Sequence, residues 1–140
     1  MRAYPIDSPQ AASRLLAMVL VADGHYAPSE LKTLDRLGAC ERLGLSPQGM
    51  KAVIDTFCQE LMTAQQGKWQ GSAGMPPGLR QRLLGEVRNP RLREKVRLLC
   101  EAIVLADGHL ADSEVEVLEA MADAWRQKPT QAWRTVTARM

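Results

Sequence analysis

The sequence predicts a compact, all-α domain of seven helices. Hydrophobic residues make up 46% of the 140 residues, but aromatic residues only 4%, and a core of Leu, Ala, Val, Ile and Met favours helices over sheets. Apolar residues recur at helical spacing, and prolines and glycines separate these stretches, as they do where helices begin and end. We expect a single domain over residues 1–140.

Serine–proline pairs and glycines delimit the first three helices. Ser8 and Ser46 are each followed by proline, which is the pattern of an N-cap and the first helical position. Gly24 and Gly44 end helices, because glycine readily takes the left-handed conformation of a C-terminal turn. The expected helices are 9–22, 28–44 and 47–66. The apolar stripe of the third comprises Met50, Val53, Ile54, Phe57, Leu61 and Met62.

The second half begins with a predicted loop at residues 67–78, where glycines, serine and a Pro-Pro pair leave no periodic pattern. Asn89-Pro90 separates a short fourth helix from a fifth, and Asp112-Ser113 caps a sixth. Lys128-Pro129 ends the sixth before a short seventh helix near the C-terminus. The ranges expected for the fourth and fifth are 79–88 and 90–106.

An internal repeat relates two pairs of these helices. Residues 15–37 align without gaps on residues 99–121, at an offset of 84 positions (107 − 23), and nine of the 23 pairs are identical. The identities cluster in the turn, where both copies read Ala-Asp-Gly-His followed by Ser-Glu. The repeat predicts two pseudo-symmetric helical hairpins. Their first helices end in nearly continuous apolar stretches, so we expect both to be central and buried on most sides.

The aspartates of the two turns need a stabilising partner. Asp23 and Asp107 each follow the C-terminal end of a helix, where the helix dipole disfavours a carboxylate. Backbone N–H groups of the turn can serve as that partner through Asx-type hydrogen bonds. A cation is the other candidate.

The second acid of each turn belongs to the start of the next helix. Glu30 and Glu114 lie in the first turn, where a carboxylate is favoured by the positive end of the dipole. If the two turns meet, four carboxylates converge, and such hard oxygen ligands suit Ca²⁺ or Mg²⁺. His25 and His109 would admit Zn²⁺ or Mn²⁺. Capping and dipole effects alone explain part of the motif and remain the alternative.

The turns also carry a family likeness. The residues concerned are 21–25 (Val-Ala-Asp-Gly-His) with Ser29 and Glu30, and 105–109 (Leu-Ala-Asp-Gly-His) with Ser113 and Glu114. They resemble the TerB-like tellurite-resistance family over essentially the whole chain. The resemblance implies a seven-helix domain without catalytic activity, connected with tellurite resistance and the stress response, that binds a metal and a protein partner. The implied metal ligands are Asp23, Glu30, Asp107 and Glu114. No organic cofactor is implied.

Two other functions are weaker alternatives. Residues 40–54 resemble a helix-turn-helix, whose second helix would offer Gln48 and Lys51 to DNA bases. That helix also carries Asp55 and Glu60 and little other positive charge, which disfavours phosphate contacts. A metal-dependent hydrolase needs more than paired carboxylates, and no nucleophile–base pair, phosphate loop or HExxH motif is present. We therefore expect neither an enzyme nor a nucleic-acid partner.

Charge, cysteines and hydropathy give further expectations. The net charge is +2, but residues 80–97 contain seven basic residues and residues 101–123 seven acidic ones and no Lys or Arg. This distribution predicts either separate basic and acidic surfaces or solvated helix faces that offset each other. The cysteines Cys40, Cys58 and Cys100 are expected to be buried and unpaired. The longest apolar run, 15–22, is too short to span a bilayer, so we expect a cytoplasmic protein.

Overall fold

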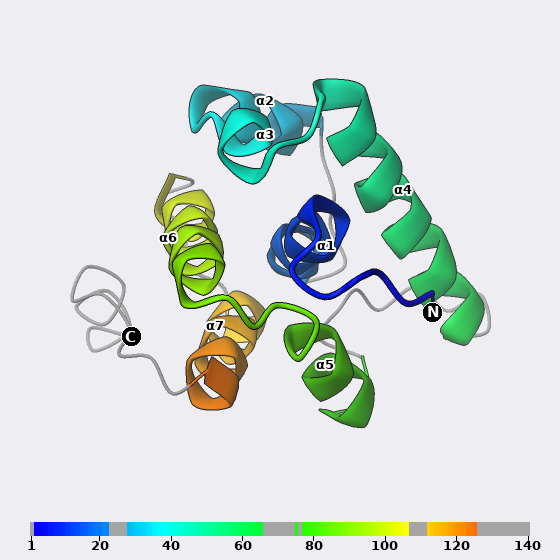
Figure 1. The fold of residues 1–140 in the computed structure, drawn as a ribbon. Coiled ribbons are helices and arrows are strands. Elements are labelled where there is room, and N and C mark those ends of the chain that lie inside the picture. Colours follow the sequence, from blue (N-terminus) through cyan, green and yellow to red (C-terminus); the bar gives the residue numbers. More distant parts are fainter. Residues whose placement is uncertain (1, 23–27, 66–74, 76, 107–111, 126–140) are drawn as a thin grey trace.

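Seven α-helices make up most of the part of the chain that this computed structural model describes, which is residues 2–22, 28–65, 75, 77–106 and 112–125 (Figure 1). The helices are α1 (Pro9–Leu20), α2 (Pro28–Arg36), α3 (Ala39–Leu43), α4 (Pro47–Ala64), α5 (Pro77–Leu84), α6 (Pro90–Ala106) and α7 (Asp112–Trp125). No strand occurs in these residues. The predicted all-α fold class is confirmed.

Helix α1 lies at the centre, with the other helices arranged around it (Figure 1). The Ser8 hydroxyl caps its start by accepting a hydrogen bond from the Ala11 N–H at 3.1 Å. Every residue from Ala11 to Ala22 is buried, and α1 packs most extensively against α4 and α6. Burial on all sides is possible because this stretch contains only one charged residue, Arg14.

Helix α6 is less buried than expected. It buries one stripe, which consists of Val96, Leu99, Cys100, Ile103 and Val104. Its N-terminal half carries many charged side chains, and Arg91, Glu94 and Lys95 are exposed. Such side chains are costly to bury, so α6 is largely buried only in its C-terminal half, where Glu101 is buried as well, and the prediction of a helix buried on most sides holds over the full length of α1 alone.

The helix predicted over residues 28–44 is two helices. Gly38 adopts a left-handed conformation with φ of 65° and separates α2 from α3. Gly44, with φ of 81°, then ends α3 as expected. A glycine inside an amphipathic pattern is compatible with a continuous helix, so the sequence did not reveal this break. The resulting α2–α3 corner faces the start of α4.

Helix α4 follows its prediction closely. The Ser46 hydroxyl accepts a hydrogen bond from the Gly49 N–H at 3.0 Å, and the apolar stripe packs toward α1. Five of the six predicted stripe residues are buried, whereas Met62 is 47% exposed. Met62 follows Leu61 directly, and a step of one residue turns its side chain about 100° away from the stripe.

The remaining boundaries differ from expectation in two places. Helix α5 begins at Pro77, inside the predicted loop 67–78, and ends at Leu84, four positions before Arg88. Helix α6 has its predicted range, and the Asn89 side chain caps it by accepting hydrogen bonds from Arg91 N–H and Leu92 N–H. The predicted short C-terminal helix lies outside the described residues. The described residues still contain seven helices, because the predicted second helix is split into α2 and α3.

The two repeated helix pairs are related only in part. The second helix of each pair packs on the first helix of the other, α2 on α6 and α7 on α1, and α1 packs on α6. Helix α7 also packs on α6 of its own pair, whereas α2 packs mainly on α3. The cross-packing is common to both pairs, but α2 and α7 have different main neighbours, so the predicted pseudo-symmetric hairpins are not confirmed. None of the described helices has the length and hydropathy that crossing a membrane requires.

Candidate functional site

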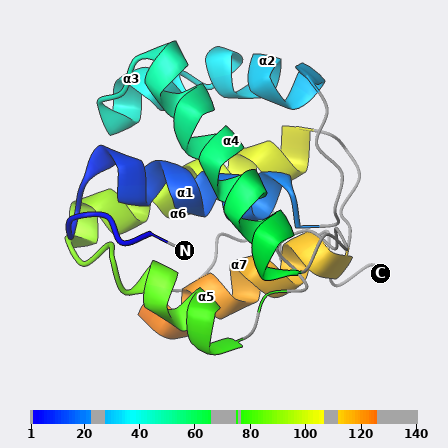
Figure 2. The ribbon, with the colours of Figure 1, turned by 90° about the vertical axis from the view of Figure 1, so that its right-hand side faces the viewer.

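The helix ends that flank the two repeated turns lie on one side of the molecule. Helices α1 and α6 end there and α2 and α7 begin there, at the right of Figure 2. The packing of α1 against α6 and α7 holds these helices together. The ends of α1 and α6 lie between the start of α2, at the top of the view, and the start of α7, near its bottom (Figure 2).

The second helices of the two pairs begin at equivalent positions. Pro28 is the first residue of α2 and Asp112 the first residue of α7, and they are 84 positions apart (112 − 28). Glu30 and Glu114 are consequently both the third residue of their helix, in the turn where the dipole favours a carboxylate. Their side chains are outside the described part.

The other predicted ligands fall outside the described residues. These are Asp23, His25, Asp107 and His109. Among the residues that the structure describes, no group of three or more His, Cys, Asp or Glu side chains is placed to hold a metal. The hypothesis of a shared carboxylate site thus remains a prediction.

The chain leading into the first turn is held firmly in the core. Val21 N–H donates to the Ala17 carbonyl at 3.1 Å, and Ala22 N–H to the Val19 carbonyl at 3.3 Å. Val21 and Ala22 are fully buried. Because Asp23 follows Ala22 directly, the residue before this predicted ligand is fixed in the centre of the fold.

A buried ion pair that the sequence did not reveal ties the N-terminal segment to the core. Arg14, 1% exposed on α1, pairs with Glu86, which follows α5. The Arg14 guanidinium also donates to the Arg2 carbonyl at 2.6 Å and lies 4.4 Å from the centre of the Tyr4 ring. Glu86 accepts a second hydrogen bond from the Tyr4 N–H at 3.2 Å. The signal in the sequence was a lone arginine in an apolar helix.

Asp7 makes a second connection between the N-terminal segment and the rest of the chain. It has a left-handed backbone with φ of 62°, and its carboxylate accepts hydrogen bonds from Asn89 N–H at 2.8 Å and Arg88 N–H at 2.6 Å. These backbone hydrogen bonds hold the pKa of Asp7 below its usual value. Asp7 therefore joins the start of α1 to the connection between α5 and α6.

Much of the basic segment 80–97 is used inside the molecule. Arg80 lies 3.7 Å from Glu116 of α7, and Arg97 bridges Glu94 and Glu101 on its own helix. Arg93 donates to the Val87 carbonyl and lies over the ring of Trp125. These contacts pair basic with acidic segments, in line with charges that offset each other.

The helix-turn-helix alternative gains no support from this geometry. Gly44 does connect α3 to α4, and Gln48 and Lys51 are exposed. Lys51 is paired with Asp55 at 3.4 Å on the same helix face, and α3 is only five residues long. A carboxylate beside the presumed DNA-contacting lysine disfavours a phosphate backbone.

The cysteines are unpaired, as expected. The expected burial holds for Cys100 but not for Cys40 and Cys58, which are half-buried. Burial and the charge of Asp55 raise the pKa of the Cys58 thiol to about 11. No disulfide joins the three residues.

Comparison with known proteins gives one match. A family model described as "Tellurite resistance protein TerB" matches residues 10–135, which include all seven helices except the first residue of α1. No curated protein and no solved structure matches the chain significantly.

Proposed function

The chain belongs to the TerB family, and from this we propose that it is a non-catalytic binding module that holds a divalent cation at its two acidic turns. Its ligands are Asp23, Glu30, Asp107 and Glu114, with His25 and His109 as additional candidates. A protein partner recognises the module, in the context of tellurite resistance or a stress response.

One observation supports this proposal above all. Helices α2 and α7 begin at equivalent positions of the repeat, so Glu30 and Glu114 have the same place in the first turn. The flanking ends of α1 and α6 lie on the same side (Figure 2). Two copies of an acidic motif whose flanking helix ends lie on one side of the molecule are compatible with a shared cation site.

The chemistry of the donor set fits a hard cation. Carboxylates bind Ca²⁺ with one or both oxygens, so four of them can supply most of a shell of about six to eight oxygens. Mg²⁺ would keep some water ligands, and coordination by the imidazoles would favour Zn²⁺ or Mn²⁺. The negative C-terminal end of α1 disfavours the charge of Asp23, and that of α6 disfavours the charge of Asp107. A bound cation would offset both repulsions.

The test is to titrate the purified protein with Ca²⁺, Mg²⁺, Mn²⁺ and Zn²⁺. Isothermal calorimetry measures the heat of binding, and thermal unfolding measures any change in melting temperature. A cation that binds only the folded state stabilises it by about 2.7 kcal/mol at a concentration of one hundred times Kd. We expect Asp23→Asn and Asp107→Asn each to weaken binding, while Asp123→Asn, at an exposed position of α7, leaves it unchanged. No heat and no thermal shift with any of the four ions would refute the cation site.

A further inference from the structure

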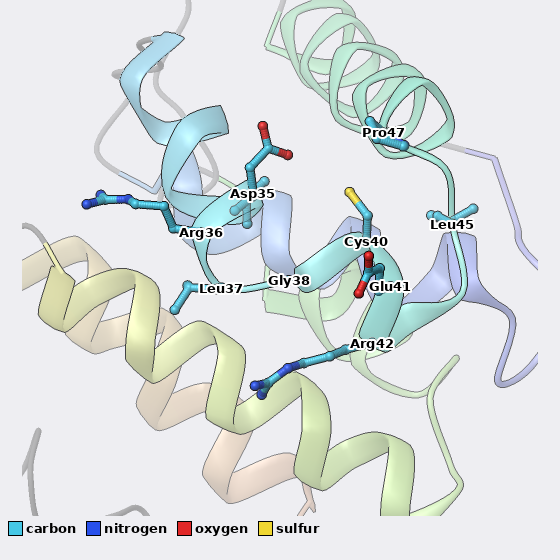
Figure 3. A pocket seen from close by; sticks show the side chains of 10 residues that line it. Asp35, Arg36, Leu37, Gly38, Cys40, Glu41, Arg42, Leu45 and Pro47 are labelled. Atoms are coloured by element: carbon cyan, nitrogen blue, oxygen red, sulfur yellow. The ribbon is translucent and has the colours of Figure 1, made fainter.

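A groove is present at the corner formed by α2, α3 and the start of α4 (Figure 3). It consists of two adjoining hollows of about 480 and 170 Å³, and the larger lies within the range of about 300–1,000 Å³ that is usual for ligand pockets. Both hollows share four lining residues, which are Leu34, Asp35, Cys40 and Pro47. We call the two hollows together the corner groove.

The break at Gly38 produces this groove. A continuous helix over residues 28–44 would carry the chain straight on, whereas the left-handed Gly38 turns α3 away from the line of α2. Helix α2 packs on α3 and α6. The apolar floor between α2 and α4 consists of Leu34, Cys40, Pro47 and Met50.

The rim of the corner groove carries two exposed acids. Asp35 and Glu41 are exposed and form no ion pair with any residue of the described ranges. Lys51, on the opposite rim, is paired with Asp55. Arg36 and Arg42 also line the larger hollow, but in Figure 3 their side chains extend away from Cys40, whereas Glu41 lies beside it.

The thiol of Cys40 lies near Asp35 and Glu41 (Figure 3). Burial raises the pKa of Cys40, and the charges of Asp35 and Glu41 raise it further. Both carboxylates therefore act on the same point above the apolar floor. A ligand seated there would meet an apolar surface and two negative charges together.

We propose that the corner groove docks a segment of another protein in which a large apolar side chain stands next to a lysine or arginine. The apolar side chain fills the floor at Leu34 and Met50, and the cation lies between Asp35 and Glu41. An acidic partner would be repelled, because its charge would have to approach both carboxylates. The groove lies at the end of α2 opposite to Glu30, so this interaction is independent of the cation site.

The experiment uses two synthetic amphipathic peptides with identical leucines, one with lysine and one with glutamate at every polar position. Each is added to the full chain while iodoacetamide alkylates the cysteines, and mass spectrometry gives the rates at Cys40 and Cys58. We expect the lysine peptide to slow alkylation of Cys40 several-fold without affecting Cys58. The glutamate peptide is expected to have no effect on either cysteine.

Variants separate the charge contribution from non-specific association. We expect Asp35→Asn with Glu41→Gln to weaken protection by the lysine peptide about three- to tenfold, since exposed ion pairs contribute modestly. Glu119→Gln with Asp123→Asn, two exposed acids of α7, serves as the matched control and should retain full protection. Because neutralising Asp35 also changes the reactivity of Cys40, each variant is compared with and without peptide.

Three results would overturn the proposal. The first is equal protection by both peptides, and the second is protection that survives loss of both Asp35 and Glu41. The third is binding of the lysine peptide, detected by fluorescence anisotropy, that leaves the alkylation of Cys40 unchanged. None of these outcomes depends on a divalent cation, so failure here is distinguishable from failure of the cation site.

Discussion

At the scale of single residues, a buried ion pair between Arg14 and Glu86 holds the N-terminal segment in place. Arg14 and Glu86 lie 72 positions apart in sequence and meet beneath Tyr4, where neither is accessible to solvent. Removing one member of a buried pair leaves the other as an uncompensated charge, and this costs far more than losing a surface pair. The two kinds of pair are both present near the N-terminus, so they can be compared directly.

We expect Arg14→Met to lower the free energy of unfolding by about 3–5 kcal/mol, because the Glu86 carboxylate would remain buried without its partner. The double variant Arg14→Met with Glu86→Leu should regain much of this loss. Urea unfolding followed by circular dichroism measures both. Arg2→Ala, at the exposed pair with Glu60, is the control and should cost about 1 kcal/mol or less. Equal effects of Arg14→Met and Arg2→Ala would contradict the assigned roles.

Asp7 predicts a dependence of stability on pH. Its pKa in the folded state is lowered from 3.8, chiefly by hydrogen bonds from Asn89 N–H and Arg88 N–H. A lowered pKa stabilises the fold above the pKa of the unfolded state, and this stabilisation is lost as the pH falls through the lower, folded pKa. Asn tolerates the left-handed backbone, so Asp7→Asn removes the charge alone. Its melting temperature should lie below that of the wild type at neutral pH, and the difference should close below pH 3.8. A constant difference at every pH would show that the charge is not responsible.

Cys40 gives a third prediction at this scale. Asp35→Asn should lower the pKa of the Cys40 thiol, because a negative charge that opposes the thiolate is removed. The alkylation rate of Cys40 at a fixed, moderately alkaline pH should then rise, since the thiolate is the nucleophile. Cys58 responds to Asp55 instead and should keep its rate.

At the scale of the elements, local capping signals were sufficient to predict most helix boundaries. The starts at Ser8, Ser46 and Pro90 were correct because caps are decided by neighbouring residues. The break at Gly38 was missed because nothing nearby distinguishes a left-handed glycine from a helical one. The Arg14–Glu86 pair was missed because its members are brought together only by the complete fold.

Two glycines test whether the corner between α2 and α3 depends on backbone conformation. A side chain at Gly38 would meet no atom within 4 Å, but the φ of 65° is strained for any other residue. We expect Gly38→Ala to destabilise the protein by about 1 kcal/mol in urea unfolding. Gly78 in α5 also has open space and no positive φ, so Gly78→Ala should not destabilise. If Gly38→Ala were neutral, the corner would not require the left-handed glycine.

At the scale of the whole molecule, both copies of the repeat form a pair of helices, but the two pairs do not have the same neighbours. The sequence correctly predicted a TerB-family, all-helical chain with a buried first helix. It could not predict that α2 would pack on α3 and α6 while α7 packs on α1 and α6, because the insertion of α3 has no counterpart after α7 in the described chain. The acids of the turns remain assigned by pattern, and their shared role stays a prediction.

Native mass spectrometry of the intact chain is the most direct test of a cation shared by the two turns. After incubation with each of the four divalent ions and desalting, we expect a mass increase of a single ion per chain for at least one metal. Asp23→Asn and Asp107→Asn should each abolish it, because one site draws on both turns. A metal-free mass under all conditions, or an ion that survives in both variants, would show that the two turns do not share a cation.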